Sequence, residues 1–141
     1  MSRSVAVIDT NVVVAGLLTS NPGSPVARIL DGMLAAAFPF VVSEALLAEY
    51  RTVLIRSELR KLHGLSVTEV DTILTELAQH AIVLNPREES VSRAPDRADQ
   101  LLWDLLAAKP DLVLVTGDKK LLFDAAMDGR VISPLEFTTT A

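Results

Sequence analysis

Two apolar runs of the chain are each followed by an aspartate, a residue type that can cap a helix, pair with a cation or bind a metal ion. Val5 to Ile8 leads directly into Asp9, and Leu112 to Val115 is followed, after two residues, by Asp118. Uninterrupted apolar runs of this kind are typical of strands buried on both faces. Because an unpaired buried charge costs several kcal/mol, Asp9 is either a helix cap or the first residue of a site.

Three further carboxylates could join the same site. Glu49 lies in the predicted helix after the second strand, and Asp96 and Asp99 open the helix that leads into the strand before Asp118. Each has an ordinary explanation: Asp96 as an N-cap and Asp99 as compensation of the helix dipole. Asp118 could be a turn residue and Glu49 a surface residue. Carboxylates crowded at one place repel one another unless they are protonated or bridged by cations, so the joint pattern favours a site.

A site of carboxylates without cysteine suits hard divalent ions. The chain has no cysteine, which excludes disulfides, thiolate metal sites and cysteine nucleophiles. Mg²⁺ or Mn²⁺ held by a few carboxylates keeps open positions for a phosphate. Two such ions can activate a water and stabilise the leaving oxygen of a phosphodiester. The residues therefore indicate metal-dependent phosphoryl chemistry.

Predicted strands alternate with predicted helices along the chain. The strands are Val5 to Ile8, Phe40 to Val42, Ala81 to Leu84, Leu112 to Val115 and Val131 to Ile132. The helices are one from Pro25 after a Ser24 cap, Glu44 to Arg56 after Ser43, one after the capping box Ser66 to Glu69, one opened at Asp96 to Asp99 with Trp103 on its flank, and Lys119 to Met127. This alternation indicates a parallel sheet with helices on both faces. The carboxyl ends of parallel strands meet at one edge, where ligands bind.

The segment Thr10 to Leu18 is ambiguous. Its three consecutive valines favour a strand, whereas Asp9 or Thr10 could cap a helix.

Composition indicates one globular domain over residues 1–141. Half of the 141 residues are hydrophobic and the mean hydropathy is +0.37, but no apolar run reaches the roughly 18 residues of a membrane span. The N-terminus lacks the pattern of a secretory signal. We therefore expect a cytoplasmic protein with no membrane partner.

The net charge of −5 does not attract nucleic acid to the protein as a whole. A phosphate-bearing substrate would need metal ions or a local basic patch. The candidate phosphate contacts are Arg51, Arg56 and Lys119, with Arg60, Lys61, His63 and Lys120 nearby in the sequence. A solvated helix face is the ordinary alternative for this group.

Four segments in order resemble the PIN domains, metal-dependent ribonucleases with a small α/β/α fold. They are I-D-T-N-V at Ile8 to Val12, V-S-E-A-L-L-A-E-Y at Val42 to Tyr50, A-P-D-R-A-D-Q-L-L-W-D-L-L-A at Ala94 to Ala107, and L-V-T-G-D-K-K-L-L at Leu114 to Leu122. The resemblance covers nearly the whole chain. It implies a three-layer α/β/α sandwich with a central parallel sheet of about five strands in the order 3-2-1-4-5, and a helix from Thr10.

The resemblance also implies roles for particular residues. The acidic tetrad that would bind Mg²⁺ or Mn²⁺ is Asp9, Glu49, Asp99 and Asp118, with Asp96 as an additional aspartate and Asn11 and Thr116 as supporting polar residues. The implied activity is endonucleolytic hydrolysis of single-stranded RNA. Many small members are toxins inhibited by a small antitoxin protein, and homologous domains often form homodimers, so both are expected by resemblance.

Other functions are compatible with parts of the pattern. A haloacid-dehalogenase-like phosphatase also places an aspartate after its first strand, but needs a second one at the position of Asn11 and a lysine for which there is no clear candidate. A receiver-like signalling module needs paired acids early in the chain, where Arg3 and Ser4 stand. A PIN fold that binds a partner without significant catalysis also remains open.

Overall fold

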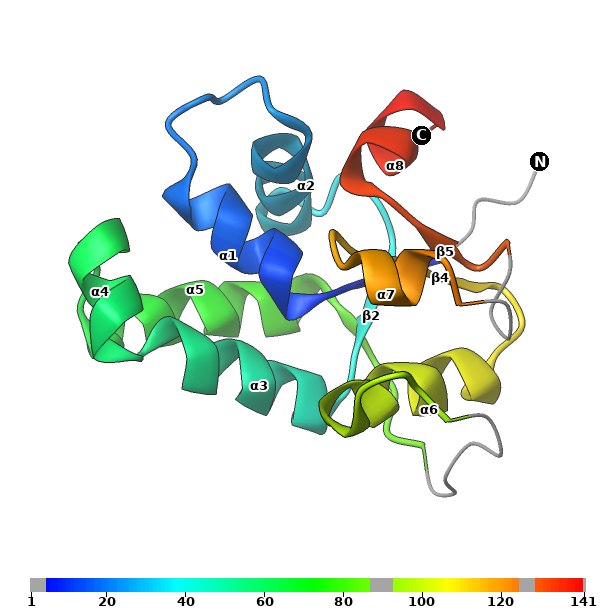
Figure 1. Ribbon diagram of the computed structural model, residues 1–141. Helices are drawn as coiled ribbons and strands as arrows, with labels where there is room; N and C mark the ends of the chain where they lie inside the picture. Colours follow the sequence, from blue (N-terminus) through cyan, green and yellow to red (C-terminus); the bar gives the residue numbers. More distant parts are fainter. Residues whose placement is uncertain (1–4, 87–92, 125–128, 141) are drawn as a thin grey trace.

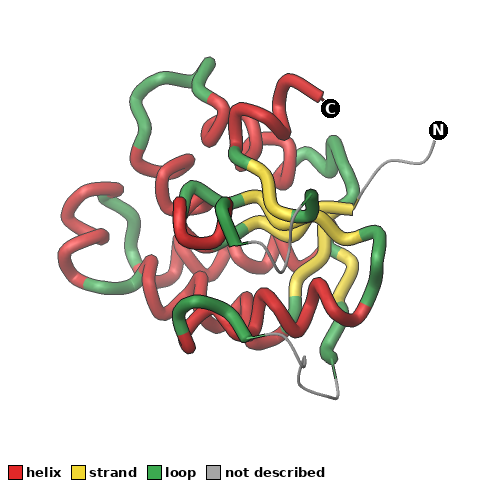
Figure 2. The backbone as a smooth tube through the Cα atoms, turned by 45° about the vertical axis from the view of Figure 1, so that its right-hand side comes forward, coloured by secondary structure: helices red, strands yellow, loops and turns green. Residues whose placement is uncertain are grey.

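The computed structural model describes residues 5–86, 93–124 and 129–140. A five-stranded parallel sheet in the order β3-β2-β1-β4-β5 forms its centre (Figures 1 and 2). The strands are β1 (Val5–Ile8), β2 (Phe40–Val42), β3 (Ile82–Val83), β4 (Leu112–Val115) and β5 (Val131–Ile132). The strand order expected from the family resemblance is therefore confirmed.

Helices surround the sheet, with α1, α2 and α8 above the strands and α3 and α6 below them in the view of Figure 1. The helices are α1 (Thr10–Leu18), α2 (Pro25–Leu34), α3 (Glu44–Leu54), α4 (Ser57–His63), α5 (Val67–His80), α6 (Gln100–Ala108), α7 (Lys119–Leu122) and α8 (Pro134–Thr140), with a 3₁₀ turn η1 (Arg97–Asp99) before α6. In these described segments no helix combines the length and apolar character that crossing a membrane requires.

The central strand β1 pairs with β4 over its whole length, from Val5 opposite Leu112 to Ile8 opposite Val115. Both strands are almost completely buried, as their uninterrupted apolar sequences predict. This register places the residues that follow Ile8 and Val115 next to each other at the carboxyl edge of the sheet. The fold thus brings together the two loops that carry Asp9 and Asp118.

The ambiguous segment Thr10–Leu18 is a helix, as the family resemblance implies, because Asp9 caps it and burial of Val12 and Val13 against the core outweighs the strand preference of valine. Other predicted boundaries differ from the structure. The helix predicted to reach Arg56 ends at Leu54. The third strand is shorter than Ala81 to Leu84 and lies at an edge of the sheet.

The C-terminal half also departs from the sequence-based expectations. The helix from Lys119 ends at Leu122, and residues 125–127 of the predicted segment lie outside the described part. Trp103, predicted on the flank of its helix, is fully buried, because α6 packs against both β4 and α3. The helix α8 was not predicted.

Helices α1 and α2 approach each other closely at Gly16. A Cβ atom at this position would lie 2.8 Å from the backbone oxygen of Val26 and 2.9 Å from the Cβ of Leu30. Both obstacles are rigidly attached to α2, so a side chain can be accommodated only if the helices move apart. The absence of a side chain at Gly16 therefore sets the spacing of the first two helices.

We expect Gly16→Ala to lower the free energy of unfolding by about 1–3 kcal/mol, because overpacking outweighs the gain of up to about 1 kcal/mol in helix propensity. Gly23→Ala is the control, since its Cβ would meet only the Asn21 side chain, at 3.4 Å. Chemical denaturation of both variants provides the measurement. A Gly16→Ala protein as stable as the wild type would show that the helices adjust without cost.

Candidate active site

Asp9 lies at the centre of the site and is only 5% exposed. Its Oδ1 accepts a hydrogen bond of 2.7 Å from the backbone amide of Thr10, so it caps α1. Its Oδ2 accepts from the Thr116 hydroxyl at 2.7 Å and from the Asn11 side-chain amide at 3.2 Å. Burial raises the pKa of Asp9, the hydrogen bonds from Thr116 and Thr10 oppose the shift, and the charges of Glu49 and Asp118 add to it. Asp9 is thus both a helix cap and a member of an acidic cluster.

Asn11 and Thr116 connect the loops after β1 and β4. The Asn11 Nδ2 also donates to the Thr116 hydroxyl oxygen at 3.2 Å, and its Oδ1 accepts from the Gly117 amide at 3.1 Å. The same Thr116 oxygen accepts from the Asp118 amide at 3.0 Å. The fully buried Thr116 hydroxyl therefore donates once and accepts twice, which uses its whole hydrogen-bonding capacity. Asn11 and Thr116, predicted as supporting residues, thus join the loops after β1 and β4 next to Asp9.

Asp118 is half-buried and caps the short helix α7, with its Oδ1 accepting from the Lys120 amide at 2.9 Å. A surface hollow of about 280 Å³ lies beside it and is also lined by Asn11, Gly117 and Pro134. The carboxylate therefore stands at the edge of a space that is open to a ligand.

Glu49 reaches the site from α3. The Thr10 hydroxyl donates to its Oε2 at 2.6 Å. The next residue, Tyr50, is fully buried and donates its hydroxyl hydrogen to the backbone oxygen of Ile8. Burial raises the pKa of Tyr50 well above its ordinary value, and the charges of Asp9 and Glu49 raise it further. The tyrosine ties α3 to the end of β1 and so places Glu49 beside Asp9.

The sequence analysis did not predict that Thr10 and Tyr50 position the site. A signal existed for Tyr50, since it is the single tyrosine of the chain, stands on an otherwise apolar helix face and needs a partner for its hydroxyl when buried. Nothing in the local sequence around Thr10 indicates that its hydroxyl donates to Glu49 on another helix.

Asp96 and Asp99 approach the cluster from the start of α6. Asp96 is an N-cap, as its ordinary explanation predicts, with its Oδ1 accepting from the Ala98 amide at 3.0 Å. Asp99 occupies the N-cap position of α6 but makes no capping hydrogen bond. Burial raises the pKa of Asp99 to about 6, and the remaining causes are all negative charges, those of Asp9, Asp96, Asp118 and Glu49. The fold therefore gathers the five predicted acids from four separate segments of the chain into one electrostatic environment.

The chemistry of this cluster fits a hard divalent cation. Its donors are carboxylate oxygens, which Mg²⁺ and Mn²⁺ prefer, and burial together with the neighbouring negative charges raises the pKa of Asp9 and of Asp99. Within residues 5–86, 93–124 and 129–140, no three acidic or histidine side chains lie close enough to hold one ion as they stand. Asp9, Glu49 and Asp118 instead each accept a hydrogen bond from the protein itself, from the Thr116 hydroxyl, the Thr10 hydroxyl and the Lys120 amide respectively.

The predicted phosphate contacts do not form one patch. Arg51 pairs with Asp71 of α5, with its Nε 2.8 Å from Oδ1 and its second nitrogen 3.3 Å from Oδ2. The exposed Arg56 lies where α3 leads into α4, far from α7 in Figure 1. Lys119 is exposed and directly follows Asp118. Of the three, Lys119 is the cation next to the acidic cluster in the chain.

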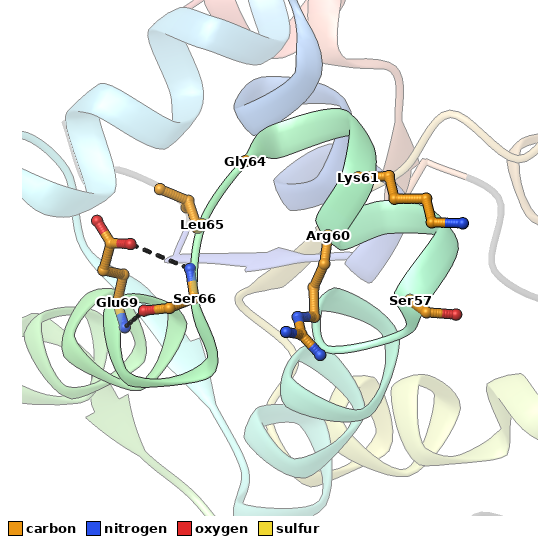
Figure 3. Close-up of a pocket in the computed structure, with 7 residues that line it drawn as sticks. All are labelled: Ser57, Arg60, Lys61, Gly64, Leu65, Ser66 and Glu69. Carbon is orange, nitrogen blue, oxygen red and sulfur yellow. Dashed lines mark hydrogen bonds between the residues drawn. The ribbon is translucent and has the colours of Figure 1, made fainter.

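Two other basic residues, Arg60 and Lys61, line a hollow of about 460 Å³ between α4 and the start of α5 (Figure 3). The helix α4 ends at Gly64, whose φ of 73° is left-handed and favours glycine. Across the hollow, Ser66 and Glu69 form the predicted capping box, with hydrogen bonds of 3.0 and 3.1 Å. The polar groups of Ser66 and Glu69 are therefore used to begin α5.

We expect Asp99→Asn to stabilise the metal-free protein at pH 7 but not at pH 4. The Asp99 pKa is about 6 when folded against an ordinary 3.8, so the wild type loses stability as the pH rises from about 4 to about 6, and the amide abolishes this loss. The gain should be roughly 1 kcal/mol, since solvent screens a partly exposed charge. Thermal melting in chelator across this pH range measures it.

Asp71→Asn is the matched control, because the hydrogen bond from Arg51 lowers the pKa of Asp71 and the change should destabilise at pH 7. Millimolar Mn²⁺ should stabilise the wild type more than Asp99→Asn, since a ligand of the folded state raises its stability. If Asp99 only compensated the helix dipole, its loss would instead cost about 0.3–1 kcal/mol and Mn²⁺ would have no specific effect.

Comparison with known proteins adds an independent finding. A family model described as PIN domain matches residues 5–120 of the chain, which include β1, β4 and all five acidic residues of the cluster. A comparison with curated proteins finds no match. The chain therefore belongs to the PIN-domain family, whose members are generally nucleases.

Proposed function

We propose that this protein is an endoribonuclease that hydrolyses phosphodiester bonds of single-stranded RNA with Mg²⁺ or Mn²⁺ at the acidic cluster. The observation that carries the proposal is the environment of Asp99, whose pKa is raised by burial and by four other carboxylates. Such an accumulation of like charge is unfavourable without a bound cation. Membership of a family of nucleases supports the same reading.

In this proposal the four acids Asp9, Glu49, Asp99 and Asp118 hold the metal ions, with Asp96 as an additional ligand. Bound ions of this kind supply an activated water and stabilise the leaving oxygen of a phosphodiester. The neighbouring side chains orient the ligands: Thr116 and Asn11 direct Asp9, and Thr10 directs Glu49. Partners of this type commonly change metal affinity or activity tenfold to hundredfold.

The phosphatase alternative gains no support from the structure. At the position where it requires a second aspartate, the amide of Asn11 is hydrogen-bonded to Asp9, Thr116 and Gly117. A PIN fold that only binds a partner would have no need for the charge accumulated around Asp99. Turnover of RNA separates these readings from the proposed one.

The family resemblance supports a wider proposal about the biological setting. We infer that the protein acts in the cytoplasm as the toxin of a toxin–antitoxin pair, that a small antitoxin protein inhibits it, and that it forms a homodimer. A small open reading frame beside the gene, whose product copurifies with the protein and blocks its activity, would support this role.

We expect the purified protein to cleave a short single-stranded RNA with Mg²⁺ or Mn²⁺ and to be inactive in excess chelator. The products should carry a 5′-phosphate and a 3′-hydroxyl, because the attacking oxygen comes from water. Asp99→Asn and Glu49→Gln should each lower the rate at least about a hundredfold, since they alter proposed ligands rather than their outer partners. Products ending in a 2′,3′-cyclic phosphate, or full activity in chelator, would refute the mechanism.

If the predicted basic residues contact phosphates, replacing them should reduce the dependence of RNA affinity on salt concentration. Lys119→Ala should weaken binding and reduce the slope of log affinity against log salt by about 0.7, the value for one phosphate of a single strand. Arg51→Ala should have a smaller effect because Asp71 already pairs with that guanidinium. If the triple alanine variant at Arg51, Arg56 and Lys119 kept the wild-type affinity and slope, all three assignments would be wrong.

A further inference from the structure

Phe123 is a large apolar side chain exposed to solvent, five residues after Asp118 in the chain. It is 81% exposed, the highest value among the exposed large hydrophobic residues in the described part of the chain. The other three phenylalanines contact one another, with ring centroids 6.0 Å apart for Phe38 and Phe40 and 5.1 Å apart for Phe38 and Phe137. Phe123 therefore stands apart from the aromatic packing of the protein.

The short helix α7 connects this ring to the site. Asp118 caps the helix, and the Leu122 amide donates to the backbone oxygen of Asp118 at 3.0 Å. Phe123 follows as the last residue of the turn, with its amide donating to the Lys119 oxygen at 3.1 Å. The buried Leu121 anchors the turn. Five residues at about 1.5 Å each place Phe123 roughly 7.5 Å along the axis from Asp118, the length of about two stacked nucleotides at 3.4 Å each.

Two lysines lie between Asp118 and Phe123 in the sequence. Lys119 and Lys120 are both exposed, in a protein whose net charge is −5. An exposed aromatic ring next to adjacent lysines is complementary to an anionic strand with exposed base faces. Base stacking on aromatic side chains, combined with cations along the backbone, is how single strands are bound without sequence preference.

We propose that Phe123 is a stacking platform for an unpaired base of the RNA substrate, while Lys119 and Lys120 contact the adjoining phosphates. This inference rests on the proposed function and specifies its substrate as RNA whose bases near the cleaved bond are unstacked. A base inside a duplex is covered on both faces by its neighbours and cannot lie on the ring. Phe123 therefore selects for single-stranded segments through geometry rather than through base identity.

The test compares two oligonucleotides in chelator, so that binding is measured without cleavage. One is a short single-stranded RNA, and the other has the same length and phosphates but abasic sugars. Phe123→Ala should weaken binding of the base-bearing strand by about fivefold to a hundredfold and leave binding of the abasic strand unchanged. Phe123→Trp should retain wild-type binding of both. Fluorescence anisotropy gives the affinities.

Leu62→Ala is the matched control, because Leu62 is a 69% exposed apolar residue of α4, far from α7 in Figure 1. It should bind both strands as the wild type does. The inference would be overturned if Phe123→Ala lost the same affinity for both oligonucleotides, or if it lost no affinity for the base-bearing strand. Failure of the wild type to bind the single-stranded RNA would also overturn the inference. So would evidence that a second copy of the chain covers the ring, which would be seen if Phe123→Ala dissociated a dimer without changing the affinity for RNA.

Cleavage with Mn²⁺, measured in parallel, separates this inference from the proposed function. If the wild type cleaves RNA and Phe123→Ala binds both oligonucleotides as the wild type does, only the stacking role is wrong. If binding depends on Phe123 as expected but the wild type shows no metal-dependent cleavage, the nuclease proposal is wrong and the single-strand binding surface remains.

Discussion

The structure depends on satisfying one buried carboxylate at the end of the central strand. Asp9 follows β1 into a position that is 5% exposed, where an unpaired charge would be strongly destabilising. Pairing of β1 with β4 brings Thr116 alongside, and hydrogen bonds from its hydroxyl, from Asn11 and from the Thr10 amide stabilise the charge. The same hydrogen bonds cap α1 and join the loops after β1 and β4. The contacts that stabilise the buried carboxylate therefore also form the framework of the site.

The surrounding acids show a balance between stability and function. Thr10 and Tyr50 hold α3 against the end of β1 and keep Glu49 near Asp9, while Asp99 enters without a capping bond of its own. A fold selected only for stability would not collect these charges, since, in addition to burial, neighbouring carboxylates raise the pKa of both Asp9 and Asp99. Unfavourable interactions of this kind are characteristic of functional sites.

An acidic protein that binds an anionic polymer must concentrate its attractive groups locally. The number of basic residues alone would overestimate the attraction at Arg51, because this residue forms an ion pair with Asp71 of the neighbouring helix. In the proposed function, Lys119 and Lys120 beside Asp118 act over a short distance, where metal ions and single lysines matter more than the net charge of −5. The proposed stacking on Phe123 would add an attraction that does not depend on charge.

The sequence by itself determined the parallel α/β architecture, because buried strands and the polar residues that end them are local patterns. The family resemblance named the acidic residues that the fold gathers. The sequence also determined the caps at Ser24, Ser43 and Ser66. Local patterns left the valines after Asp9 undecided between strand and helix, although the family resemblance implied a helix. Only the tertiary structure decided that Trp103 is buried and that Arg51 is paired. These outcomes depend on contacts between residues distant in the chain, such as Thr10 with Glu49, and burial against such partners outweighs local preference.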